Sequence, residues 1–211
     1  MSNERNPAAA GPGIVLLGDS ILDNKSYTEG EPSVVEHLNA ILGGHGWAQN
    51  LAVDGSSSIN VPEQLASMPA EATHIVLASG GNDALQYEGL LGADVGTMAE
   101  ALAVFIEPLR TFRADYEALQ SRLLPHRQRG IQLLVCTIYN GNFPEPYDSV
   151  IRVALGLFND IIYQLSHDYD YPTLELRRIC TQASDYANPI EPSGSGGRKI
   201  AQAIASYAQG R

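Results

Sequence analysis

The feature that most limits the fold of this chain is a series of short apolar runs that end in polar or glycine-containing turns. Residues 14–17 (IVLL) stop at Gly18, and residues 74–78 (HIVLA) are followed by Gly80-Gly81. Continuous apolar runs of this length are typical of strands that are buried on both faces, as in a parallel sheet. The pattern therefore favours a sheet covered by other elements on both sides.

Segments with helical spacing separate these runs. We expect strands over 14–17, 47–53, 74–78, 131–138 and 173–176, and helices over 31–42, 61–67, 94–129, 149–167 and 195–208. Pro108 is expected to split or kink the long 94–129 stretch, because proline lacks an N–H group and clashes with the preceding turn. The alternation of strand and helix predicts an α/β fold around a five-stranded parallel sheet.

The length of 211 residues fits one domain. Residues 1–12 are polar and rich in Ala, Pro and Gly, so we predict a flexible N-terminal tail there and a single domain over residues 13–211. Apolar residues make up 44% of the chain, which is enough to build a core. This composition excludes a disordered or collagen-like chain.

Charge and motifs exclude several classes of partner. The formal net charge of −11 argues against nucleic acid and anionic lipid as partners. No apolar run reaches the ~18 residues of a membrane span, and no hydrophobic secretory signal opens the sequence, so we expect a cytoplasmic protein. Two cysteines are too few for a disulfide framework or a zinc site, and phosphate-loop and dinucleotide motifs are absent. We therefore expect neither a metal nor a cofactor.

Three polar segments directly follow three of the predicted strands. They are Gly18-Asp19-Ser20, Asp54-Gly55-Ser56 and Gly80-Gly81-Asn82-Asp83. In a parallel sheet the loops after the strands share one edge, where functional residues gather. Together the segments supply a hydroxyl, backbone N–H groups beside glycines and a carboxamide, which are the parts of a serine nucleophile with an oxyanion hole.

These three blocks, in this order, resemble the SGNH hydrolases, also called GDSL esterases and lipases, and the resemblance runs from about residue 13 to 209. It implies a flavodoxin-like, three-layer α/β/α sandwich. It also implies that Ser20 is the nucleophile, and that the N–H groups of Ser20 and Gly55 and the side chain of Asn82 form the oxyanion hole. The implied substrate is a small-molecule ester or acylated compound.

The fourth block departs from the family pattern. Where the family has Asp-x-x-His-Pro, this chain has Asn188-Pro-Ile-Glu191-Pro, so that Glu191 stands in the place of the catalytic histidine and Asn188 in that of the aspartate. The five histidines of the chain lie in other elements, and none is a convincing base. Glu191 is either a general base whose pKa is raised from ~4.3 by burial, or a residue that only orients its loop or caps the next helix. Asp185, six residues earlier, is a candidate for sharing a proton with Glu191.

Four further residues are candidates for substrate contact. Asp23 and Asn24 follow the nucleophile closely, although both residue types also cap helices. Tyr139 and Phe143 lie in the loop after the fourth strand and either wall an acyl pocket or only cover the sheet edge. The leading hypothesis is a serine hydrolase of the SGNH type acting on an ester. The alternatives are an impaired family member that binds a small acyl or carbohydrate ligand, and an acyltransferase of the same fold.

Overall fold

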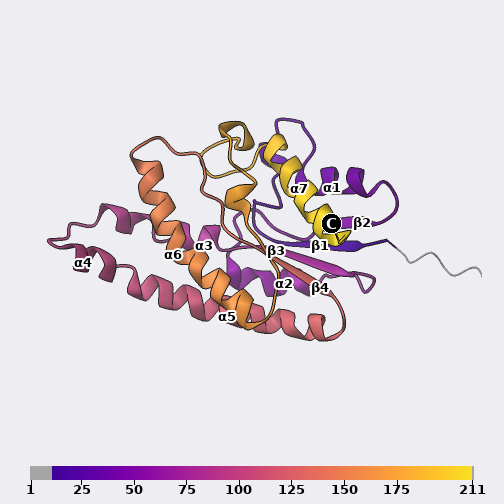
Figure 1. Ribbon diagram of the computed structural model, residues 1–211, viewed down its shortest axis with the longest axis horizontal. Coiled ribbons are helices and arrows are strands. Elements are labelled where there is room, and N and C mark those ends of the chain that lie inside the picture. The colour runs from indigo at the N-terminus through magenta and orange to yellow at the C-terminus, as the bar shows by residue number, and fades with distance from the viewer. Residues whose placement is uncertain (1–10, 211) are drawn as a thin grey trace, which may run out of the picture.

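The computed structural model describes residues 11–210, so most of the tail predicted over 1–12 lies outside the described residues. Five parallel strands form one sheet in the order β2-β1-β3-β4-β5 (Figure 1). The strands are β1 (Gly13–Gly18), β2 (Trp47–Asn50), β3 (His74–Ala78), β4 (Gln132–Cys136) and β5 (Thr173–Leu174). The predicted α/β class and five-stranded parallel sheet are confirmed.

The strands are connected by α-helices and by shorter 3₁₀ turns. The α-helices are α1 (Val34–Leu42), α2 (Val61–Leu65), α3 (Gly81–Leu85), α4 (Met98–Ala103), α5 (Ile106–Gln128), α6 (Tyr147–Asp168) and α7 (Gly194–Ala208). The 3₁₀ turns are η1 (Lys25–Tyr27), η2 (Ser58–Asn60), η3 (Glu88–Gly92), η4 (Leu176–Arg178) and η5 (Ala183–Asp185).

The helices cover both faces of the sheet, which explains the unbroken apolar runs. Alternate residues of β1 point to opposite faces, so Leu16 packs with α1 and α7, whereas Leu17 packs with α2, α5 and α6. Both leucines are fully buried. The result is the three-layer α/β/α sandwich, with α7 and α1 on one side and α5 and α6 on the other (Figure 1).

The predicted break in the 94–129 stretch exists, but its position differs. The helical pattern is interrupted at Val104 and Phe105, and Pro108 is the third residue of α5. Proline is tolerated there because the first-turn N–H groups of a helix have no acceptor within the helix. Pro125 also lies inside α5, near its C-terminal end.

The carboxyl ends of β2, β1 and β3 lie side by side, since Leu16 pairs with Asn50 and Gly18 with Ala78. The three polar segments predicted to meet therefore leave the sheet at one edge. Within residues 11–210, no helix combines the length and apolar character that crossing a bilayer requires.

Candidate active site

Ser20 lies on a tight turn directly after β1. Gly18 has a φ of +128°, and a Cβ there would come within 1.7 Å of the Ala78 carbonyl oxygen, so only glycine fits. The Asp19 N–H donates to the same carbonyl at 3.1 Å, and the Ile21 N–H donates to Asp19 Oδ1 at 3.0 Å. These bonds fix the turn that presents the Ser20 side chain to a cavity.

Gln64 on α2 completes the hydrogen bonding at the end of β1, a role that the sequence does not reveal. Its Oε1 accepts from the Gly18 N–H at 2.8 Å, and its Nε2 donates to the Gly18 carbonyl at 2.8 Å. Strand β2 ends at Asn50, so the Gln64 amide takes the place of a neighbouring strand beside Gly18. Nε2 also donates to Ser56 Oγ at 3.3 Å, which links the nucleophile turn to the loop of Gly55.

The loop that carries Gly55 is tied to the third polar segment. Asn82 Nδ2 donates to the Ser56 carbonyl at 2.8 Å, and the Ser58 hydroxyl donates to Asp83 Oδ1 at 2.6 Å. Gly55 has a φ of +79° and is exposed. Within the described residues, the N–H groups of Ser20 and Gly55 donate to no intramolecular acceptor. They are therefore available to an oxyanion, although Gly55 lines a second cavity rather than the one beside Ser20.

Glu191 is held in the wall of the cavity by a turn that begins at Asn188. Asn188 Oδ1 accepts from the N–H groups of Ile190 at 2.9 Å and Glu191 at 3.0 Å, and the Tyr139 hydroxyl donates to the Ile190 carbonyl. Asn188 thus acts on the backbone of Glu191. Only 6% of Glu191 is exposed.

Burial raises the pKa of Glu191 to about 6, and the negative charge of Asp54 acts in the same direction. The Ser20 hydroxyl acts in the opposite direction and lowers the pKa of Glu191 by interacting with its carboxylate. Glu191 Oε2 is buried without a partner among the described residues. Catalytic hydrogen bonds are often long before substrate binds, so the absence of one between Ser20 and Glu191 is compatible with proton transfer between them once substrate is bound.

Asp19 is a second buried carboxyl at the same site. Burial raises the pKa of Asp19 to about 8, and the charge of Glu191 contributes in the same direction. Its Oδ2 has no partner among the described residues. Asp19 is therefore mostly neutral at pH 7, which leaves Glu191 as the principal negative charge beside Ser20.

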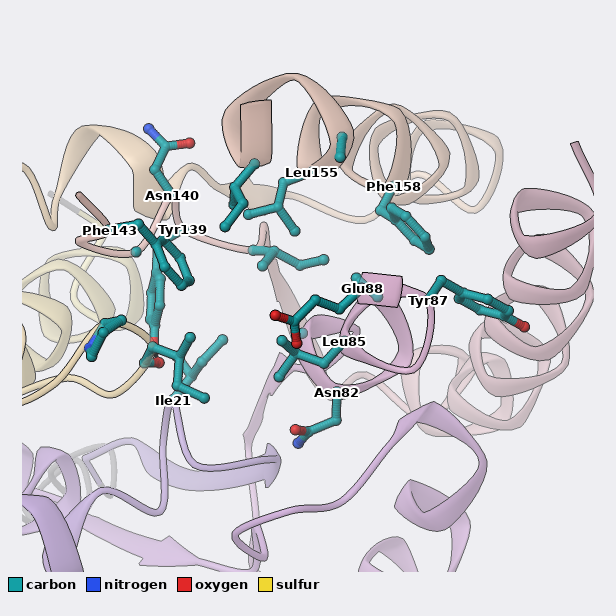
Figure 2. A pocket seen from close by; sticks show the side chains of 18 of the residues that line it. Ile21, Asn82, Leu85, Tyr87, Glu88, Tyr139, Asn140, Phe143, Leu155 and Phe158 are labelled. Atoms are coloured by element: carbon teal, nitrogen blue, oxygen red, sulfur yellow. Dashed lines mark hydrogen bonds between the residues drawn. The ribbon is translucent and has the colours of Figure 1, made fainter. Parts of the chain in front are cut away.

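A cavity of about 380 Å³ opens beside Ser20 and is largely apolar (Figure 2). This volume is near the lower end of the ~300–1,000 Å³ of small-molecule sites. Leu155 and Phe158 of α6 form one wall, and Leu85 of α3 lies opposite. Tyr139 and Phe143 both line the cavity, so the loop after β4 contributes to its wall.

Asp23 and Asn24 lie in supporting positions outside the residues that line this cavity. Asp23 accepts from Asn50 Nδ2 at 2.8 Å and from the Asp54 N–H at 3.1 Å, which anchors the loop of Gly55. Asn24 is fully buried. Its Oδ1 accepts from the Val34 N–H at 2.9 Å, and its Nδ2 donates to the carbonyls of Pro192 at 3.2 Å and Ser193 at 3.3 Å. Asn24 thus connects the nucleophile loop to the fourth block.

None of the five histidines lines the cavity beside Ser20. His74 begins β3, at the end of the sheet opposite the site, and burial lowers its pKa. The carboxylate of Asp185 is paired with Lys199 rather than with Glu191: it is fully buried, forms an ion pair with Lys199 at 2.7 Å and accepts from the Thr181 and Gln182 N–H groups. Across residues 11–210, no group of His, Cys, Asp and Glu side chains is arranged to hold a metal ion.

Solved structures share this fold over almost the whole chain. Phospholipase A1 from Streptomyces albidoflavus covers 93% of this chain and 99% of its own, with a TM-score of 0.70 and 15% identity. An acetylxylan esterase from Geobacillus stearothermophilus covers 95% of both chains, with a TM-score of 0.67 and 15% identity. A putative GDSL-like lipase from Parabacteroides merdae covers 95% of this chain and 96% of its own, with a TM-score of 0.66 and 17% identity.

No curated protein matches the sequence. The model of the GDSL-like lipase/acylhydrolase family matches residues 16–198, which include the Ser20 turn, the Gly55 loop, the Asn82 segment and the fourth block. The chain therefore belongs to the GDSL-like lipase/acylhydrolase family.

Proposed function

We propose that this family member is a carboxylic ester hydrolase in which Ser20 is the nucleophile and Glu191 replaces histidine as the general base. The observation that carries the proposal is the placement of Glu191. Its carboxylate is buried in the wall of the cavity that also receives Ser20, and its pKa is about 6. At pH 7 such a group is mostly ionised, yet it is a stronger base than an ordinary glutamate.

In the proposed reaction, Ser20 Oγ attacks the ester carbonyl carbon while its proton passes to Glu191. The carbonyl oxygen becomes an oxyanion that accepts from the N–H groups of Ser20 and Gly55 and from Asn82. Collapse of this intermediate breaks the bond to the leaving alcohol, which takes the proton from Glu191. Glu191 then removes a proton from water, which attacks the acyl-enzyme carbonyl carbon. When the bond between this carbon and Ser20 Oγ breaks, Ser20 Oγ takes the proton back from Glu191 and the acid is released.

A second candidate is an impaired member that binds a small acyl or carbohydrate ligand without efficient turnover. The incomplete hydrogen bond between Ser20 and Glu191 favours it, because a serine without a positioned base is a weak nucleophile. An acyltransferase is the third candidate, in which an acceptor alcohol takes the place of water. An acyl-enzyme that water releases slowly and an added alcohol releases quickly would identify this activity.

The experiment compares hydrolysis of p-nitrophenyl acetate and butyrate by the wild type, Ser20→Ala, Glu191→Gln and a control, Glu145→Gln. Glu145 is exposed and bonds to Ser149 outside the cavity. We expect both site variants to lose about 10²-fold or more in kcat, the scale of a positioned base, and the control to keep its activity. A wild type no faster than Ser20→Ala would refute the hydrolase and favour the ligand-binding protein.

A further inference from the structure

The cavity beside Ser20 combines aromatic rings with carboxyl groups and contains no cationic side chain. Its aromatic residues are Tyr87, Phe105, Tyr139, Phe143, Tyr147 and Phe158. Among the described residues that line it, there is no lysine, arginine or histidine. Three carboxyl groups line the cavity, from Asp19, Glu88 and Glu191. The electrostatic character of the site therefore disfavours an anionic substrate.

Glu88 is the carboxylate that the ester chemistry does not use. Its side chain extends from η3 over Leu85 into the middle of the cavity (Figure 2). Tyr139 and Phe143 lie on one side of it and Phe158 lies on the other. Its Oε1 accepts from the Tyr147 hydroxyl at 3.0 Å. The Tyr147 ring meets that of Phe143 edge to face, with ring centres 5.8 Å apart. One carboxylate and two aromatic rings therefore adjoin at one side of the cavity.

Two buried oxygens in the same cavity also lack partners. Asp19 is 2% exposed and Glu191 is 6% exposed, and within the described residues neither Asp19 Oδ2 nor Glu191 Oε2 has a hydrogen-bond partner. An unpaired buried carboxylate is costly, so positive charge on a ligand is favoured by the ionised Glu191, whereas Asp19, which is mostly neutral at pH 7, adds no charge. Aromatic faces and carboxylates are the groups that bind amines and quaternary ammonium ions.

From this arrangement we infer that the site prefers esters that carry a cationic group, with the ammonium held by Glu88 and the rings of Tyr147 and Phe143. The inference rests on the proposed function and adds the class of substrate. The neutral apolar wall formed by Leu155 and Phe158 is left for the hydrocarbon part of the ester.

The test compares butyrylcholine with 3,3-dimethylbutyl butyrate, which has the same shape with carbon in place of the charged nitrogen, and with 2-sulfoethyl butyrate, which is anionic. The interaction of a cation with an aromatic face and a neighbouring carboxylate is strong enough to raise kcat/KM for the cationic ester about tenfold or more over the neutral one. We therefore expect the order cationic, neutral, anionic in kcat/KM. Glu88→Gln is expected to lower the ratio of kcat/KM for the cationic to the neutral ester about tenfold, and Glu145→Gln to leave this ratio as in the wild type.

Binding to the Ser20→Ala variant separates this inference from the proposed hydrolysis, because it needs no turnover. Calorimetry should show that butyrylcholine binds about tenfold more tightly than its neutral isostere, and that this difference shrinks when Glu88→Gln is added. Preferred binding of the cation without hydrolysis by the wild type would support the cationic site and refute the hydrolase. Hydrolysis with equal preference for the cationic and neutral esters, unchanged by Glu88→Gln, would refute the cationic site alone.

Discussion

Replacing Gln64 with leucine tests whether a single side chain holds the nucleophile turn in place. The substitution keeps the size of a buried residue but removes three hydrogen bonds, two to the backbone of Gly18 and one to Ser56. The Gly18 carbonyl still accepts from the Val53 N–H at 3.0 Å. The Gly18 N–H, by contrast, is left buried without an acceptor.

The expected loss of stability follows from these lost hydrogen bonds. An unsatisfied buried donor costs about 1–3 kcal/mol, and each lost hydrogen bond contributes about 1 kcal/mol. We therefore expect Gln64→Leu to lower the free energy of unfolding by about 3 kcal/mol. For a domain of this size, this corresponds to a decrease in Tm of roughly 6–12 °C. Because Ser20 lies two residues beyond Gly18, we also expect kcat on p-nitrophenyl butyrate to decrease about tenfold or more, with a smaller change in KM.

Calorimetric melting and steady-state kinetics measure the two effects, with the exposed neighbour Glu63→Gln as the control. Gln64→Glu adds a pH test. Burial raises the pKa of a carboxyl in the folded state above its unfolded value, so the stability this group contributes is lost as the pH rises. This variant should therefore be less destabilised at pH 5 than at pH 8. A Gln64→Leu protein that melts within 1 °C of the wild type and retains its kcat would refute the reasoning.

Two further variants test the supports of the site. Asn24→Ala removes the hydrogen bonds to Val34, Pro192 and Ser193, so it should lower Tm and decrease kcat. The control Asn39→Ala lies on the exposed side of α1 and should affect Tm alone. Asp19 has a folded pKa of about 8, above its unfolded value of ~4, so the stability that its neutral form provides is lost progressively as the pH rises between these two values. The Tm of the wild type should therefore decrease more steeply between about pH 5 and 8 than that of Asp19→Asn. Parallel profiles would contradict the buried, neutral carboxyl.

The sheet and the meeting of the three polar segments could be predicted because both depend on local patterns. Apolar runs such as 14–17 mark strands covered on both sides, and parallel strands bring the segments after them to one edge. The strand over 74–78 was predicted with its observed bounds. The strand expected over 47–53 ends at Asn50, because the N–H groups of Leu51 and Ala52 both turn to the Leu16 carbonyl.

The residues that hold the site could not be predicted, since their contacts are distant in sequence. Gln64 meets Gly18 across 46 positions, and Asn24 meets Pro192 across 168. A glutamine in a short helix carries no local signal of such a partner. Glu88 lies in a 3₁₀ turn within a stretch that lacks a clear strand or helix pattern, and its contact in the cavity is with Tyr147, 59 positions away.

The family resemblance identified the position of Glu191, but its chemistry depends on surroundings that the sequence does not give. The rise in pKa comes from burial in the cavity wall and from the charge of Asp54, 137 positions away. Asn188, which stands where the family has aspartate, supports the Glu191 backbone through two hydrogen bonds. These contacts hold the backbone of Glu191 at the cavity wall, where we propose that it acts as the base.

The pH dependence of kcat/KM for p-nitrophenyl butyrate, measured for the wild type and Glu191→Gln, tests the central claim most directly. Since this profile reports the pKa of the free enzyme's base, we predict that the wild-type rate rises with pH around a midpoint of about 6. In Glu191→Gln this limb should vanish and the rate should be about 10²-fold lower. The same midpoint and a similar rate in both proteins would contradict Glu191 as the base for Ser20.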